Sequence, residues 1–220
     1  MNTTREVKQV INGLKTADGD GVQLTRLIGS AYLDQLDPFL LFDAFGSDKP
    51  QDYIGGFPPH PHRGFETVTY MHAGKMRHKD SMGNGSVVKA GGVQYMSAGR
   101  GVTHSEFNPS KAEPVKFLQI WLLPNKRGGA PRYDTLDISP TDKDGKLKLF
   151  LSKDGRDGSM LIHADADIYA ATLKGEQRIE TQLPQGHKGW VQVANGTLTV
   201  NGQELRKGDG LSISQAGKIV

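Results

Sequence analysis

The chain has 220 residues, a hydrophobic content of 36% and a formal net charge of +3 from 27 basic and 24 acidic residues, and it contains no cysteine. The lack of cysteine excludes disulfides, iron–sulfur clusters, thiolate metal sites and cysteine nucleophiles, so any metal ion has to be held by His, Asp or Glu. The weak, scattered positive charge argues against direct binding of nucleic acid. The N-terminal segment lacks the apolar core of a signal peptide, and the longest apolar run, FLQIWLL (117–123), is too short to span a membrane. These features predict a cytoplasmic protein with no membrane contact.

Short runs of β-forming residues, separated by glycine turns, follow one another along the chain. In chain order they are VQLTRLI (22–28), FLLFDAF (39–45), FETVTYM (65–71), SVVKA (86–90), GVQYMS (92–97), KFLQIWLL (116–123), LKLFLS (147–152), DIYAATL (167–173), GWVQVA (189–194) and GTLTVNG (196–202). The Asn-Gly and Asp-Gly pairs between many of them suit tight hairpin turns. No stretch keeps a helical period over three turns. The pattern predicts an all-β protein built from barrels or sandwiches.

The segment PNKRGGAPRYDTLDISPTDKDGK (124–146) is rich in proline, glycine and charge, and it is the best candidate for a linker. The stretches 74–99 and 194–214 on either side resemble each other in their order of strands and glycine turns, which predicts two similar β-barrels in tandem. We therefore expect one domain over residues 1–130 and a second over 131–220. The second half has only His163 and His187, far apart, and ends where a barrel needs another strand or two. We expect a degenerate, incomplete barrel without metal, which is either trimmed or borrows a strand.

Two pairs of polar residues at strand spacing point to a metal site. In PPHPHRGFETVTYMHAG (58–74), His60 and His62 share one face of a strand, and a strand that continued through Arg63-Gly64 would add Glu66 to that face. In SAGRGVTHSEFNP (97–109), His104 and Glu106 repeat the spacing. One such pair is often incidental, but two pairs bracketed by glycine turns can converge inside a small barrel. Imidazole and carboxylate ligands suit Fe(II), Mn(II), Ni(II), Cu(II) or Zn(II), and four of them leave open positions.

Two further histidines, His72 and His78, fall near these pairs in the sequence, and they are expected to support the ligands from behind or to lie at the surface.

These segments resemble the cupin superfamily and, more narrowly, the pirin family. The resemblance is carried by DPFLLFDAF (37–45), GGFPPHPHRGFETVTYMHAG (55–74), HKDSMGNG (78–85), QYMSAGRGVTHSEFNP (94–109), LQIWL (118–122) and DGRDGSM (154–160). It implies a bicupin, two tandem cupin-type β-barrels with a metal ion in the N-terminal barrel alone. The ligands that it implies are His60, His62, His104 and Glu106. The general cupin scheme would use Glu66 as the carboxylate, so Glu66 is expected as an alternative ligand or as a residue behind the ligands.

The same resemblance implies a function. Some pirins are similar to quercetin 2,3-dioxygenases, which open a flavonol ring with O2 and release carbon monoxide. This implies one divalent metal ion, most often Fe(II), with Cu, Mn, Ni, Co or Zn also compatible. We expect Glu106 or Glu66 to accept the proton of the substrate hydroxyl, and the apolar side chains that could hold a flat substrate are those of Phe45, Phe57, Met71 and Met96.

Two other functions fit the same residues. Pirin relatives are also described as regulatory proteins, either transcription cofactors or modulators of metabolic enzymes, which bind a protein partner without turnover. A metal-storing or purely structural site is a third alternative. We expect a monomer.

Overall fold

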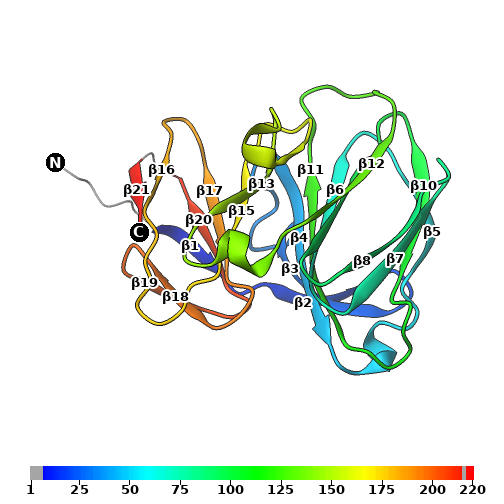
Figure 1. Ribbon diagram of the computed structural model, residues 1–220, viewed down its shortest axis with the longest axis horizontal. Coiled ribbons are helices and arrows are strands. Elements are labelled where there is room, and N and C mark those ends of the chain that lie inside the picture. The colour runs from blue at the N-terminus through cyan, green and yellow to red at the C-terminus, as the bar shows by residue number, and fades with distance from the viewer. Residues whose placement is uncertain (1–6, 215–216) are drawn as a thin grey trace.

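The structure, a computed structural model, describes residues 7–214 and 217–220, and within them the chain consists of β-strands joined by loops (Figure 1). The only helical elements of the described residues are short 3₁₀ turns, η1 (Pro50–Asp52), η2 (Pro140–Lys143) and η3 (Arg156–Gly158). The all-β prediction is confirmed. In the described part of the chain, no helix combines the length and the apolar character needed to cross a membrane.

Two sheets face each other and form the larger, N-terminal barrel. The first sheet has the strand order β12-β9-β6-β11-β4-β3-β2. Its strands are β2 (Leu14–Asp18), β3 (Val22–Ile28), β4 (Phe39–Ser47), β6 (Glu66–Ala73), β9 (Gly92–Ser97), β11 (Val115–Leu122) and β12 (Arg132–Asp137). The second sheet has the order β5-β10-β7-β8 and consists of β5 (Phe57–His62), β7 (Lys75–Asp80), β8 (Gly85–Lys89) and β10 (Val102–Phe107).

The C-terminal unit is made of shorter strands in several small sheets. The sheet β14-β13-β15 contains β13 (Lys148–Ser152), β14 (Met160–Leu161) and β15 (Ile168–Ala170). The sheet β1-β20-β17 contains β1 (Val7–Ile11), β17 (Gly189–Gln192) and β20 (Gly210–Ile213). Two antiparallel pairs complete the unit, β16 (Thr181–Leu183) with β21 (Gly217–Ile219), and the hairpin of β18 (Thr197–Val200) with β19 (Gln203–Arg206).

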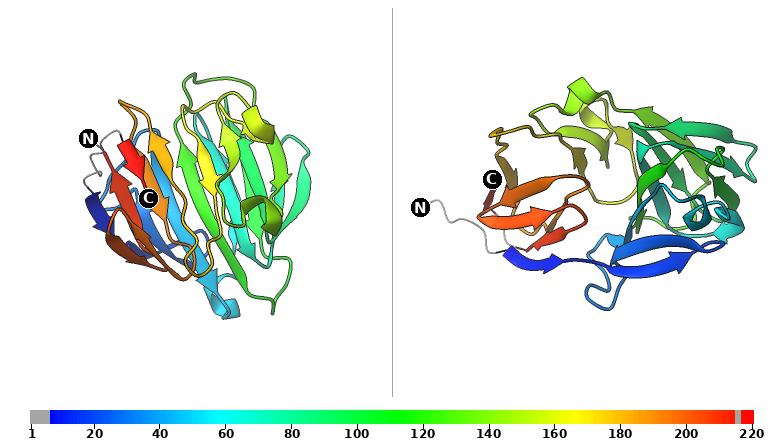
Figure 2. Two further views of the ribbon diagram at one scale, coloured as in Figure 1. Left: turned by 60° about the vertical axis from the view of Figure 1, so that its left-hand side comes forward. Right: turned by 90° about the horizontal axis from the view of Figure 1, so that it is seen from below.

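The sheets divide the chain differently from the expected boundary between residues 130 and 131. Strand β1 runs antiparallel to β20 and belongs to the C-terminal unit, and Figure 2 shows this blue strand beside the red and orange ones. Strand β12, which follows the boundary, pairs with β9 of the N-terminal barrel. The second unit therefore takes a strand from the other end of the chain, which was one of the two alternatives that the sequence left open.

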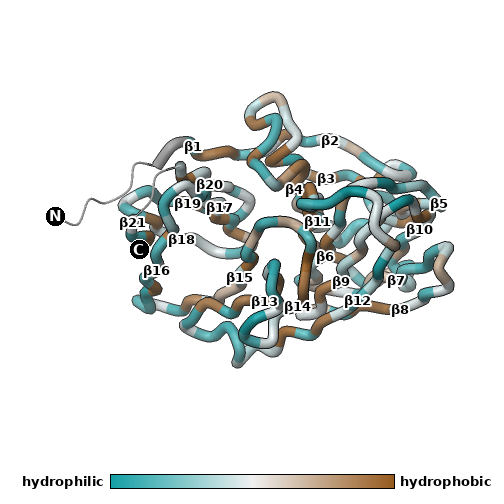
Figure 3. The backbone as a smooth tube through the Cα atoms, turned by 90° about the horizontal axis from the view of Figure 1, so that it is seen from above, coloured by the Kyte–Doolittle hydropathy of each residue, from teal (hydrophilic) through white to brown (hydrophobic). Residues whose placement is uncertain are grey.

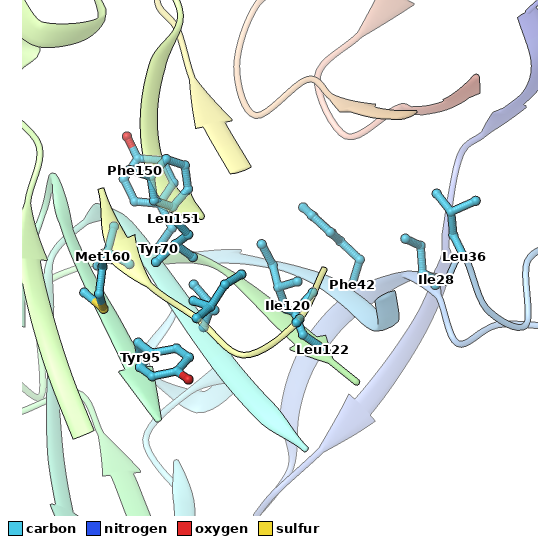
Figure 4. Packing of buried hydrophobic residues seen from close by; sticks show 14 of the residues in the cluster. Ile28, Leu36, Phe42, Tyr70, Tyr95, Ile120, Leu122, Phe150, Leu151 and Met160 are labelled. Carbon is cyan, nitrogen blue, oxygen red and sulfur yellow. The ribbon is translucent and has the colours of Figure 1, made fainter. Parts of the chain in front are cut away.

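The largest hydrophobic cluster joins the two units. Hydrophobic and hydrophilic residues are interspersed along the chain (Figure 3), and β6 and β9 each have one largely apolar face and one mixed face. The apolar face of β6 and β9 presents Val68, Tyr70 and Tyr95, which pack with Phe150 and Leu151 of β13 (Figure 4). Each fully buried side chain of this size contributes about 1.5–3 kcal/mol. The opposite face of the sheet, which includes Thr69 and Gln94, lines the interior of the N-terminal barrel together with the second sheet.

Candidate metal centre

Three histidines from two neighbouring strands come together in the second sheet. His60 and His62 lie on β5 and His104 lies on β10, and one ring nitrogen of each is within 4.8 Å of the others. The register of the two strands places His104 directly opposite His60 and Val102 opposite His62. The ring centroid of His104 is 4.4 Å from that of His60 and 4.8 Å from that of His62. We call these residues the three-histidine cluster.

The local sequence explains why β5 can hold this position. Strand β5 is the edge strand of its sheet, with only β10 beside it. Pro58, Pro59 and Pro61 have no backbone N–H to donate, which an edge strand tolerates and a central strand does not. The prolines also restrict the backbone between the two histidines. Because residues i and i+2 point to the same face of a strand, both imidazoles are directed to the inside of the barrel.

The hydrogen bonds of the cluster fix where the ring protons are. His60 Nδ1 lies 2.7 Å from the carbonyl oxygen of Pro58. A carbonyl oxygen can only accept, so this nitrogen carries the proton and His60 Nε2 presents a lone pair. His60 Nε2 lies 3.0 Å from His62 Nε2. His104 Nε2 is buried and has no hydrogen-bond partner among the described residues. A buried, unsatisfied nitrogen costs free energy unless something binds it.

The cluster fits a divalent metal ion. Two nitrogen ligands at about 2.1 Å from one ion and at right angles to each other are about 3.0 Å apart, which is the separation of the Nε2 atoms of His60 and His62. Burial, reinforced by His104 and His60, lowers the pKa of His62 to about 4. Burial, with His60 and His78 nearby, lowers the pKa of His104 to about 3. At neutral pH both imidazoles are therefore uncharged, which is the state that binds a metal ion.

Glu106, the fourth predicted ligand, lies beside the cluster and not within it. It is 6% exposed and forms a second group with His78 and His104, whose ligand atoms also lie within 4.8 Å of one another. Its Oε1 accepts hydrogen bonds from the amide of Gln94 and from Thr69 Oγ1, the latter at 3.5 Å. The described residues give Oε2 no donor. This oxygen is therefore the one that Glu106 can offer to an ion, and its role as ligand stays a prediction.

Glu66 does not share a strand face with His60 and His62, as a strand continued through Arg63-Gly64 would have required. Strand β5 ends at His62 and β6 begins at Glu66 in the other sheet, so the two do not form one strand. Gly64 between them has a φ of +80°, which ends the extended run. Glu66 is 0% exposed and lies on the outer face of the sheet, where Tyr95 Oη donates to it and His163 Nδ1 lies 2.8 Å from it. It also accepts the backbone N–H groups of His163 and Ala164 at 3.1 Å each. These bonds hold the Glu66 carboxylate on the face of the sheet that is turned away from the cluster.

The residues next to His62 differ from those expected to hold a substrate. Phe45 and Met71 are buried in the barrel interior, where Phe45 stacks on Phe117 at 5.0 Å. Met96 packs with Ala98, Val102 and Tyr133. Phe57 packs against the group that contains Phe45 and Met71, and its ring lies 6.5 Å from that of His60.

The aromatic side chains beside His62 are instead the half-buried Phe65 and Trp121. Their ring centroids lie 4.9 and 5.3 Å from that of His62 and 4.6 Å from each other. Phe65 also lines a groove of about 590 Å³ whose wall includes Arg63, Gly99 and Arg127. Neither guanidinium of this groove has an ion pair or hydrogen bond among the described residues.

The fold and the site define a bicupin with a candidate metal centre in its first barrel. A family model described as Pirin matches residues 21–122, and one described as Quercetinase C-terminal cupin domain matches residues 149–220. A pirin-like protein of Caulobacter vibrioides is 36% identical over 225 residues, which cover 93% of this chain and 81% of that protein. The chain belongs to the pirin family of the cupin superfamily, which confirms the family that the sequence indicates.

Two further relatives bear on the site. Quercetin 2,3-dioxygenase of Escherichia coli is 43% identical over 159 residues, which cover 72% of this chain and 67% of that protein. The crystal structure of the bacterial pirin YhhW from Escherichia coli, in complex with nickel(II), superposes with a TM-score of 0.81 at 29% identity, and the match covers 96% of this chain and 91% of that one. A solved relative therefore holds a divalent metal ion, in agreement with the donor set described above.

Proposed function

We propose that this protein is a metal-dependent dioxygenase that opens the ring of a flavonol-like phenolic substrate, as the sequence indicates. The observation that carries the proposal is an incomplete ligand shell beside an aromatic wall. A structural zinc site is normally closed by four protein ligands. Here three imidazoles converge, and even with Glu106 as a fourth ligand an ion that takes six ligands would keep two open positions. The side of His62 is bordered by the half-buried rings of Phe65 and Trp121. Such a site leaves room for a flat substrate next to the ion.

The ion would be held by His60, His62 and His104, with Glu106 as the fourth ligand through Oε2. When bound, it would supply Lewis acidity toward a phenolic hydroxyl and the redox chemistry for dioxygen. The proposed reaction consumes one O2 for each flavonol. Both oxygen atoms enter the cleaved product, and one ring carbon leaves as carbon monoxide. Fe(II) is the ion that we propose, and Ni, Cu, Mn, Co and Zn are the alternatives to compare.

Other side chains would pack against the substrate and accept its proton. Trp121 and Phe65 present aromatic faces against which a flavonol ring can pack, a contact worth about 0.5–1.5 kcal/mol beyond the buried area. Glu106 is the carboxylate nearest to the cluster, and we propose that it accepts the proton of the substrate hydroxyl. The hydrogen bond from Gln94 holds its Oε1, so that its other oxygen is held in a defined orientation. The single hydroxyl proton of Thr69 lies between this Oε1, at 3.5 Å, and Gln119 Oε1, at 2.8 Å.

The test is an oxygen-electrode assay on metal-free protein that has been reloaded with each ion under anaerobic conditions. With quercetin as the probe, we expect O2 consumption and release of carbon monoxide in equal amounts. Glu106→Gln should lower kcat by about 10²-fold or more, since general base catalysis contributes about 10²–10⁴-fold. Gln185→Glu, a change at an exposed turn of the C-terminal unit, serves as a control. If no ion supports O2 uptake with quercetin or other phenols, the dioxygenase function is refuted. The alternative, a regulatory protein that binds a partner without turnover, is then favoured.

A further inference from the structure

A buried histidine behind His104 takes no part in the function proposed above. His78 on β7 is 0% exposed, and β7 lies on the side of β10 away from β5. The register sets Asp80 opposite His104 and His78 opposite Glu106. The three strands β5, β10 and β7 therefore place His60, His104 and Asp80 in one row across the sheet, with His78 next to that row.

The carboxylate of Asp80 is held in one orientation by hydrogen bonds. Its Oδ1 accepts the backbone N–H groups of Met82 and Asn84 at 2.9 and 3.0 Å, and its Oδ2 accepts the side-chain amide of Asn84 at 2.9 Å. Burial alone would raise the pKa of Asp80, but the hydrogen bonds from Asn84 and His78 outweigh it and the pKa is lowered. Asp80 is thus an ionised carboxylate that can only accept hydrogen bonds.

The ring protons of the two histidines follow from that carboxylate. His78 Nε2 lies 3.2 Å from Asp80 Oδ2, so Nε2 carries the proton and Nδ1 of a neutral His78 has a lone pair. His78 Nδ1 lies 3.4 Å from His104 Nδ1. Since His78 Nδ1 accepts, His104 Nδ1 donates. His104 Nε2 is then left with a lone pair, and it is the buried nitrogen that has no partner among the described residues.

We propose that Asp80 and His78 form a relay of hydrogen bonds that holds His104 in the tautomer able to bind the metal ion, and that this relay sets the affinity of the site. His78 is a positioning residue and not a ligand, although it lies within 4.8 Å of His104 and Glu106. Both of its nitrogens are already engaged, by Asp80 and by His104. Its ring is also held by Tyr133, which stacks on it at 4.3 Å with an interplanar angle of 17°.

The proposal relies on the metal centre but not on the reaction, so its test measures binding and not turnover. Metal-free protein is titrated with Ni(II) in competition with a chelator. His78→Phe keeps an aromatic ring against Tyr133 but removes the acceptor. His78→Asn loses the stacked ring but places an amide oxygen where Nδ1 was. If His78 has a purely structural role, His78→Phe should bind Ni(II) more tightly than His78→Asn. If the relay operates, His78→Asn should bind more tightly. His187→Asn, at an exposed loop histidine, is the control.

We expect His78→Phe to weaken Ni(II) binding by about 10–100-fold, the usual cost of losing a group that orients a ligand. His78→Asn should stay within about threefold of the wild type. X-ray absorption of the Ni(II)-loaded proteins should count the same number of imidazoles in the wild type and in His78→Phe. One imidazole fewer in the variant would make His78 a ligand and overturn the proposal. Equal affinity of His78→Phe and wild type would overturn it as well.

A measurement on the wild type alone covers the case in which the variants do not fold. Long-range ¹H–¹⁵N correlation spectra of the metal-free, histidine-labelled protein report which nitrogen of each ring carries the proton. We expect the proton of His104 on Nδ1 and that of His78 on Nε2. A proton on His104 Nε2 would refute the relay, whatever the activity of the protein.

Discussion

Glu66→Gln should separate the stability of the protein from its metal binding. The carboxylate is wholly buried between the two units and accepts hydrogen bonds from Tyr95 and from the backbone of His163 and Ala164. Burial and the nearby charge of Glu66 raise the pKa of Tyr95, so its hydroxyl stays a donor. Because Glu66 lies on the outer face of the sheet, the variant should bind Ni(II) as the wild type does.

The size of the effect follows from the bonds that are lost. A hydrogen bond to a charged group contributes about 1.5–3 kcal/mol, and each donor left unpaired in the interior costs about 1–3 kcal/mol. In the Glu66→Gln variant, the amide group directs its own N–H toward a backbone N–H at one of the two former oxygen positions. We expect the free energy of unfolding to fall by about 2.5–6 kcal/mol, which adds one lost hydrogen bond to a charged group and one donor left unpaired. Tyr95→Phe, which removes one donor, should cost less.

Urea unfolding followed by tryptophan fluorescence measures the free energy of unfolding of the Glu66→Gln variant. The competition titration measures its affinity for Ni(II). Glu106→Gln is the matched comparison, because it changes the same chemical group on the inner side of the barrel. It should weaken metal binding more than Glu66→Gln does. The reasoning is refuted if Glu66→Gln leaves the stability unchanged and abolishes metal binding, since Glu66 would then act at the cluster.

Three other changes test separate parts of the structure. In the metal-free protein, His104 has a pKa of about 3 when folded and about 6.5 when unfolded, so the unfolded state takes up the proton first and stability falls as the pH drops from about 6.5 toward 3. The fall should reach about 5 kcal/mol at most, and His104→Asn should flatten the stability–pH curve measured by urea unfolding. Trp121→Leu should raise KM for quercetin by about 2–10-fold with little change in kcat, as expected for lost aromatic packing; an unchanged KM would place the substrate elsewhere. Gly99→Ala should cost at least about 2 kcal/mol more than Gly128→Ala, because both have positive φ but only at Gly99 would the new Cβ meet a backbone oxygen, that of Gly129, at 2.2 Å. Equal unfolding free energies of the two variants would contradict that contact.

The three-histidine cluster was predictable because its signal is local. Two histidines at i and i+2 share a face in any strand, and β5 and β10 are both strands. The prediction needed only that the two strands be neighbours, which the short hairpins between them favour. The pairing of His60 with His104 then follows from the register. The family resemblance pointed to the same residues and to the same all-β architecture.

The position of Glu66 was not predictable in this way. The rule for residues i and i+2 applies within one strand, and Gly64 leads the chain from one sheet into the other. A glycine in a run of β-formers is compatible with a bulge as well as with a change of sheet. The contact of Glu66 with His163 joins residues 97 positions apart, and nothing in the spacing of either residue indicates it.

The sequence left open whether His78 lies behind the ligands or at the surface, and the role of Asp80 was missed, for a related reason. Their i and i+2 spacing is visible in the sequence, and it predicts a common face. It does not predict that the face is buried, because burial depends on β10 and on Tyr133 of β12, which pack against it. The available signal was that His78 and Asp80 repeat the spacing of His104 and Glu106.

The pairing of β1 with β20 has a consequence for the order in which the molecule can form. Residues 7–11 are made about two hundred residues before their partner, residues 210–213. The N-terminal barrel can close before residues 210–213 are made, whereas the sheet β1-β20-β17 has to wait for them. Until then β1 is an unpaired strand edge, which is exposed to pairing with other chains. Long-range contacts of this kind slow folding, so β1 and β20 should be among the strands that pair late.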